Sequence, residues 1–121
     1  MILYTNLYTG IVDNENNHRF SDTWDQVYSG NFLQIPWFVV AGNHDHKGNV
    51  TAQISYSALS NRWNFPALYY TKTFVAEDIS LQVIFIDTVD LAGISCTVRA
   101  CSSEVIIYYL FITYRSINGR L

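Results

Sequence analysis

The chain has 121 residues, which is the size of one domain and enough to bury a modest hydrophobic core. Half of the residues are hydrophobic, 16% are aromatic and only 14% are charged, which excludes an intrinsically disordered chain. The formal net charge of −3 argues against nucleic acid or an anionic membrane as the general partner, because surfaces that bind such partners are usually basic.

The first part of the chain predicts a polar loop followed by a helix. Asp13–His18 has the composition of a loop, and His18 within it is expected to be exposed to solvent. Ser21 is a good N-cap residue, so we expect it to begin a helix over residues 22–28 that stops before Gly30. The residues expected to face inward are Trp24, Val27 and Tyr28.

A buried strand and a polar turn come next. Pro36–Val40 is short, β-branched and aromatic, with proline only at its start, which is typical of a buried strand. Gly42 then allows a sharp turn at the carboxyl end of this strand, where open α/β sheets place their sites. The turn carries Asn43, His44, Asp45 and His46. Amide oxygen and imidazole nitrogen are metal ligands, and imidazole can also protonate a leaving group, so this turn is the candidate site.

The middle of the chain predicts a second helix and a pair of strands. Either Asn49 or Thr51 can cap a helix over residues 51–60. Leu68–Val75 and Leu81–Ile86 are typical of strands, and the turn between them favours an antiparallel hairpin. Strand, helix and paired strands in this order indicate part of an α/β sandwich.

The turn after the first strand also resembles the asparagine–histidine block of the metallophosphoesterases. Five segments resemble the tartrate-resistant purple acid phosphatases in order and spacing: Phe20–Trp24, Pro36–Val50, Ala52–Ser57, Arg62–Pro66 and Phe85–Val89. The five segments in this order identify the family far more specifically than Gly-Asn-His-Asp alone. It implies an α/β fold, a partial four-layer α/β/β/α metallophosphoesterase sandwich, over residues 1–93. Residues 94–121 form a tail without this resemblance.

The resemblance implies an acid phosphatase. In that family a hydroxide activated by a binuclear metal centre, iron paired with zinc, iron or manganese, attacks a phosphate monoester. Asn43 would then be a metal ligand, and His44 would be catalytic, stabilising the transition state or helping to protonate the departing alkoxide. His46 would lie at the rim and shape the substrate pocket.

Other residues of the turn have structural alternatives. Asn43 could instead make a local hydrogen bond within a tight turn, and His44 could bond to nearby backbone. Asp45 is expected to orient the turn by accepting backbone N–H bonds rather than to bind metal. Asp87 ends a predicted strand, but the matching aspartate in the family is not a metal ligand, so we expect a structural role.

Most metal ligands of the family have no counterpart in these residues. The segment before Tyr8-Thr9-Gly10 carries neither the expected aspartate nor the expected tyrosine, and no histidine follows His46. We therefore expect the isolated chain to be inactive. The alternative is a non-catalytic or unstable fragment, such as a truncated or mis-spliced product, that acts only by association.

Asn49-Val50-Thr51 is an N-glycosylation sequon, and its position agrees with a glycosylated site in the resembling family. That family is secreted or lysosomal. The first ten residues have no basic or apolar region typical of a signal peptide.

The tail holds one apolar run, Val105–Ile112, which is about half of the ~20 residues that a membrane-spanning helix needs. No membrane span is therefore expected. The run favours a strand but is equally consistent with sequence never shaped by selection, and we expect residues 94–121 not to join the sheet. Cys96 and Cys101 could close a small loop or remain unpaired, and their spacing without histidine is poor evidence for zinc.

Overall fold

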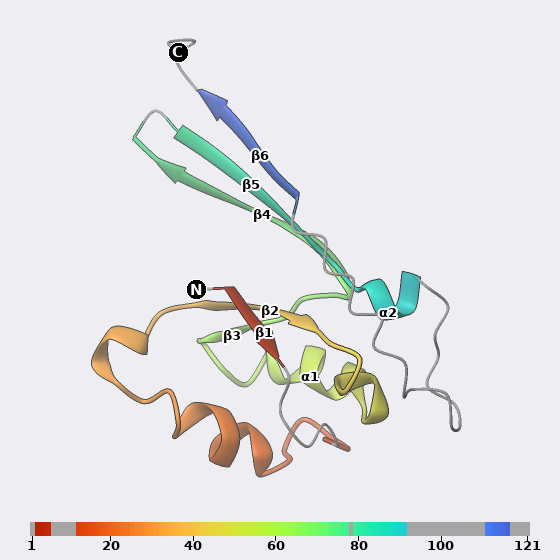
Figure 1. Ribbon diagram of the computed structural model, residues 1–121. Coiled ribbons are helices and arrows are strands. Elements are labelled where there is room, and N and C mark those ends of the chain that lie inside the picture. Colours follow the sequence, from red (N-terminus) through yellow and green to blue (C-terminus); the bar gives the residue numbers. More distant parts are fainter. Residues whose placement is uncertain (1, 6–11, 78, 92–110, 117–121) are drawn as a thin grey trace.

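A computed structural model describes residues 2–5, 12–77, 79–91 and 111–116 (Figure 1). Its strands form two three-stranded sheets. The first sheet is parallel and contains β1 (Ile2–Thr5), β2 (Trp37–Ala41) and β3 (Trp63–Asn64), with β2 in the centre. β2 lies between β1 and β3 and is largely buried, and a strand in such a position requires an almost continuous apolar sequence, which β2 has. The predicted strand at Pro36–Val40 is confirmed to within one residue.

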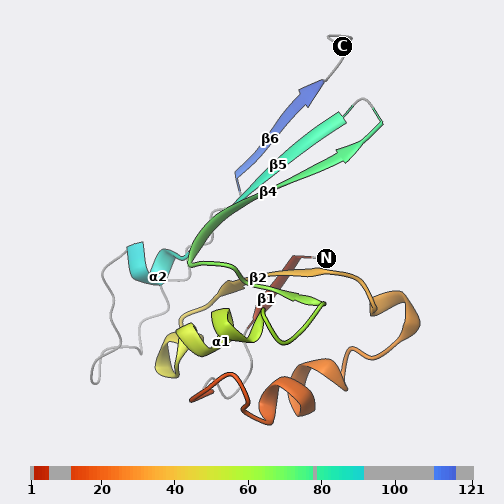
Figure 2. The same ribbon diagram turned by 180° about the vertical axis from the view of Figure 1, so that it is seen from behind.

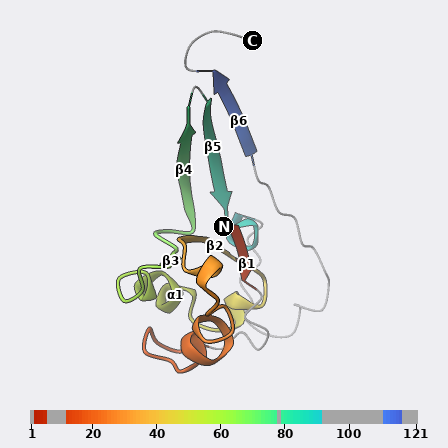
Figure 3. The same cartoon turned by 90° about the vertical axis from the view of Figure 1, so that its left-hand side faces the viewer.

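The second sheet is antiparallel and contains β4 (Tyr69–Ala76), β5 (Ile79–Ile86) and β6 (Phe111–Ser116), with β5 in the centre. The predicted hairpin of β4 and β5 is confirmed, with Tyr69 opposite Ile86 and Ala76 opposite Ile79. This sheet extends away from the first one, as Figure 3 shows most clearly.

The pairing of β6 with β5 contradicts the expectation that residues 94–121 stay out of the sheet. Ile84 lies opposite Phe111, and Ile79 lies opposite Ser116. Without β6, β5 would present a row of unpaired backbone N–H and C=O groups, and an aromatic, β-branched segment is well suited to pair with them. Most of the predicted strand at 105–112 and both cysteines, Cys96 and Cys101, lie outside the described residues.

The first helix begins earlier than expected. The π-helix η1 spans Phe20–Asp25, and its N-cap is Arg19, so the prediction of Ser21 as N-cap is wrong. The backbone N–H of Ser21 instead donates to the His18 carbonyl at 3.0 Å. Phe20 and Trp24 are both buried, and their spacing of four residues places them on one helix face, which explains the earlier start. Trp24 faces inward as predicted, whereas Val27 is 60% exposed, contrary to the prediction.

The other helices are short. The 3₁₀ turns η2 (Asn31–Leu33) and η3 (Asp45–Lys47) flank β2, and α2 (Thr88–Leu91) follows β5. The main helix, α1 (Val50–Tyr56), is capped by Asn49, one of the two predicted caps, and ends four residues before Ser60. Within the described ranges, every helix is too short or too polar to cross a lipid bilayer as a single span.

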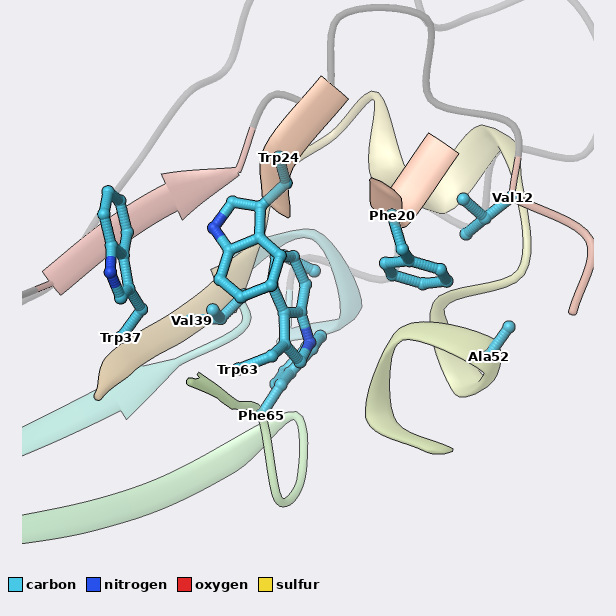
Figure 4. Packing of buried hydrophobic residues seen from close by; sticks show 9 residues of the cluster. Val12, Phe20, Trp24, Trp37, Val39, Ala52, Trp63 and Phe65 are labelled. Carbon is cyan, nitrogen blue, oxygen red and sulfur yellow. The ribbon is translucent and has the colours of Figure 1, made fainter. Parts of the chain in front are cut away.

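The main core lies between the helices and one face of the first sheet. Its buried members are mostly aromatic, and Figure 4 shows Trp24 next to Trp63 in the middle of the cluster, with Trp37 on one side of them and Phe20 on the other. The ring centroids of Trp24 and Trp63 are 5.0 Å apart, in an edge-to-face arrangement. On the opposite face of β2, Phe38 packs against Val83 and Phe85 of the second sheet. The helices therefore pack on one face of the parallel sheet and the second sheet contacts the other face, in an α/β fold from which the antiparallel sheet projects, as seen from behind in Figure 2.

Candidate functional site

The candidate site is the segment Gly42–His46, hereafter the site turn, which follows the last residue of β2, Ala41. The prediction that it lies at the carboxyl end of the first strand is confirmed. The turn is tight, because the backbone N–H of Asp45 donates to the Gly42 carbonyl at 3.0 Å and that of Lys47 donates to the His44 carbonyl at 3.1 Å. Asn43 and His44 are both only partly buried, so their polar groups can meet a small molecule.

Asp45 fixes the site turn from within. Its carboxylate is fully buried, and one oxygen accepts the backbone N–H of Gly42 at 2.8 Å. The other oxygen accepts the side-chain amide of Gln53, on α1, at 3.0 Å. Asp45 therefore orients the turn as the sequence predicts. The sequence analysis did not predict that Gln53 supports the site turn. Its place in a predicted helix, eight residues after Asp45, was the signal that could have suggested this contact.

A hydrogen bond connects the site turn to the second sheet. The His46 Nε2 atom lies 2.7 Å from the Asp87 carboxylate, and the two side chains are 18% and 0% exposed. The second Asp87 oxygen accepts the backbone N–H groups of Val89 and Asp90, at 3.1 and 3.0 Å, which caps α2. These bonds agree with the structural role expected of Asp87. Sequence analysis did not anticipate its pairing with His46.

The same hydrogen bond changes the acidity of His46. The pKa of His46 is raised above its ordinary value of 6.5, chiefly because the imidazolium donates to Asp87. Partial burial lowers this pKa, while the charges of Asp87, Asp45 and Asp90 add to the increase. The charged form of His46 is thus favoured at mildly acidic pH.

The Asn49 side chain makes hydrogen bonds both to an earlier and to a later part of the chain. Its side-chain oxygen accepts the backbone N–H of Ala52 at 3.1 Å, and its side-chain N–H donates to the Asp13 carbonyl at 2.9 Å. The predicted glycosylation residue is therefore also the N-cap of α1 and holds the preceding polar loop in place. His18 in that loop is exposed, as predicted.

Asn49→Ala should lower the free energy of unfolding by roughly 1–2 kcal/mol, because it removes the N-cap and the bond to the Asp13 carbonyl. Chemical denaturation followed by circular dichroism measures the effect in unglycosylated protein. Thr51→Ala is the matched control, since it also destroys the sequon but removes an exposed side chain outside the cap. Equal stability of the two variants would contradict the capping role.

The described residues alone do not fit a binuclear metal centre. No group of three or more His, Cys, Asp or Glu side chains in this part of the chain could hold a metal ion. Asp45 and Asp87 accept the hydrogen bonds described above, and the Nε2 atom of His46 bonds to Asp87. The Asn43 amide and the His44 imidazole remain, and two such donors are too few for two metal ions.

Comparison with known proteins points to one family, although no family model matches the chain. Tartrate-resistant acid phosphatase type 5 of Rattus norvegicus is 47% identical over 96 residues, which are 77% of this chain and 29% of the relative. The Homo sapiens protein of the same name is 46% identical over 89 residues, 71% of this chain and 27% of the relative. Purple acid phosphatase 3 of Arabidopsis thaliana is 33% identical over 85 residues, 69% of this chain and 22% of the relative.

This chain thus spans less than a third of the length of these relatives. The shared sequence nevertheless extends over more than two thirds of the chain, far beyond a single short motif. The chain therefore belongs to the tartrate-resistant (purple) acid phosphatases and corresponds to part of their catalytic domain.

Proposed function

We propose that this chain forms part of an acid phosphatase that hydrolyses phosphate monoesters, and that the site turn is its contribution to the reaction centre. The observation that carries the proposal is the position of the turn, with partly buried Asn43 and His44 at the carboxyl end of a central parallel strand. The names of its relatives supply the reaction class.

We assign different roles to the two residues. The His44 imidazole can donate a hydrogen bond to a phosphate oxygen or a proton to the departing alkoxide, since imidazole is the side chain that most often serves as a general acid. Asn43 would offer its amide oxygen to a metal ion of a binuclear centre, in which iron is paired with zinc, iron or manganese. Because the described residues supply so few donors, we propose that the 121-residue chain alone retains neither the metal pair nor turnover.

Two further assignments belong to this proposal. Asn49 is the glycosylation residue of a secreted or lysosomal protein, and its exposed position is compatible with an attached glycan. Residues 1–93 form the partial phosphatase domain. Residues 94–121 are an appended segment that contributes β6 to the second sheet.

A chimaera tests the proposed function. Residues 12–91 of this chain would replace the matching segment of the Rattus norvegicus relative, which keeps its remaining sequence. We expect this chimaera to hydrolyse an aryl phosphate at acidic pH, and His44→Ala to lower kcat by roughly 100-fold or more, as expected for loss of a general acid. His18→Ala is the control, because it removes an exposed histidine outside the site turn.

The isolated 121-residue chain is the second arm of this experiment. It should show no purple charge-transfer band and negligible phosphatase turnover. Stoichiometric iron with His44-dependent hydrolysis in the isolated chain would contradict the proposed inactivity. A folded, metal-loaded chimaera without turnover would instead favour the non-catalytic alternative, a chain that acts only by association.

A further inference from the structure

We propose that His46 is a positioning residue, which holds the site turn against the end of the second sheet through its hydrogen bond to Asp87 and releases it as the pH rises. Asn43 and His44 lie in the same turn, so an effect of His46 on catalysis rests on the proposed function. The hydrogen bond itself is independent of any metal or substrate.

The bond joins the site turn to the residue that directly follows β5. Within the first sheet and its helices, Asp45 fixes the turn to Gly42 and Gln53. Through His46 and Asp87, which are 41 residues apart in the sequence, the turn has a side-chain hydrogen bond to the end of the second sheet. The site turn is therefore attached at His46, two residues after His44, to the end of β5 as well as to α1.

Asp87 is a suitable anchor because it is itself immobilised. Its backbone N–H donates to the Leu68 carbonyl at 3.1 Å, and its second carboxylate oxygen accepts the N–H groups of Val89 and Asp90. The carboxylate is fully buried in the bonded state. Loss of the His46 bond would leave a buried charge with one fewer donor.

The charges around His46 make the interaction depend on pH. The groups that face it are Asp87 at the end of β5, Asp90 on α2 and Asp45 in its own segment, and all of them are acidic. Tyr69, on β4, donates its hydroxyl to Asp90 at 2.7 Å. The adjacent Lys47 is exposed.

The direction of the pH dependence follows from the raised pKa of His46. A histidine whose pKa is higher in the folded than in the unfolded state stabilises the fold fully below the unfolded value, about 6.5. That contribution is lost as the pH rises through the folded value. The turn should therefore be held most firmly at acidic pH.

Amide hydrogen exchange on the full 121-residue chain tests this inference. The N–H groups of Asp45, Lys47 and Gly48 are hydrogen-bonded within and next to the turn, so their protection reports its opening. In the unaltered chain their protection factors should fall as the pH rises above about 6.5, whereas those of β2 should not. His46→Gln keeps a side-chain donor but cannot titrate, so its protection should lack this pH dependence.

At pH 5, His46→Gln should reduce protection in the turn roughly tenfold, because a charged hydrogen bond is replaced by a neutral one. Asp87→Asn should have a similar effect while keeping an oxygen to cap α2. His18→Gln, which removes an exposed histidine, should change nothing.

If either variant at this pair fails to fold, NMR titration of the unaltered chain decides, because the pKa of His46 should be higher in the folded chain than in the urea-unfolded chain. Equal titration of His46 in the folded and the unfolded chain, or equal protection of the turn in His46→Gln and the unaltered chain at pH 5, would overturn the inference. Since no readout uses hydrolysis, an inactive chimaera would contradict the proposed function and leave this inference standing.

Discussion

Replacing Trp63 by alanine should lower the free energy of unfolding by roughly 3–5 kcal/mol, the usual cost of deleting a large buried aromatic side chain. Trp63 is fully buried at the centre of the main core (Figure 4). Its ring centroid lies 5.0 Å from that of Trp24, 5.7 Å from that of Phe20 and 5.9 Å from that of Tyr56. Small domains are stable by only about 5–15 kcal/mol, so the variant should lose a large share of the stability of the fold.

Urea denaturation followed by far-ultraviolet circular dichroism measures this loss without relying on tryptophan fluorescence. Phe32→Ala is the matched control, because Phe32 is also a large aromatic residue but is 94% exposed. The control should change stability by no more than about 0.5 kcal/mol. Similar losses in the two variants would contradict the described core.

Trp63 also connects the core to the site. Its indole N–H donates to the Gln53 carbonyl at 2.9 Å, and the Gln53 amide donates in turn to Asp45. The site turn is therefore supported through α1 by the aromatic cluster. Loss of Trp63 should therefore loosen the turn as well as the core.

Local sequence was sufficient to predict β2, the β4–β5 hairpin and the site turn. Each depends on residues that are close in the chain: an apolar β-branched run, a glycine at its end, or two such runs around a polar turn. The orienting role of Asp45 was also predictable, since its partner Gly42 is three residues away. Such short-range interactions are fixed by backbone geometry more than by the rest of the fold.

The features that sequence reasoning missed depend on distant parts of the chain. The helix η1 begins at Phe20 rather than after Ser21, because burial of Phe20 in the core outweighs the capping preference of serine. β6 joins the second sheet because β5 offers it an edge, which hydrophobic periodicity within β6 cannot reveal. The His46–Asp87 bond joins a residue of η3 to the residue that follows β5, 41 positions later, and likewise has no local signal.

Asp45→Ala tests whether the site turn depends on one buried carboxylate. The change removes the acceptor for the Gly42 N–H and for the Gln53 amide, both of which are buried. The Gln53 side-chain oxygen already lacks a hydrogen-bond partner among the described residues, so its whole side-chain amide would be left unpaired. Unpaired buried polar groups cost about 1–3 kcal/mol each, and we expect a total loss of roughly 3 kcal/mol.

Asp45→Asn separates the geometry from the charge. Its amide oxygen can still accept one of the two donors, so its loss of stability should be smaller than that of Asp45→Ala. Lys47→Ala, an exposed neighbour, should have almost no effect. In the chimaera, Asp45→Ala should lower turnover as His44→Ala does, although Asp45 is buried away from substrate, because Asn43 and His44 would lose their fixed orientation. Equal stability of the Asp45→Ala and Lys47→Ala variants would show that the turn keeps its shape without the carboxylate, and the site would then have to be held mainly by His46.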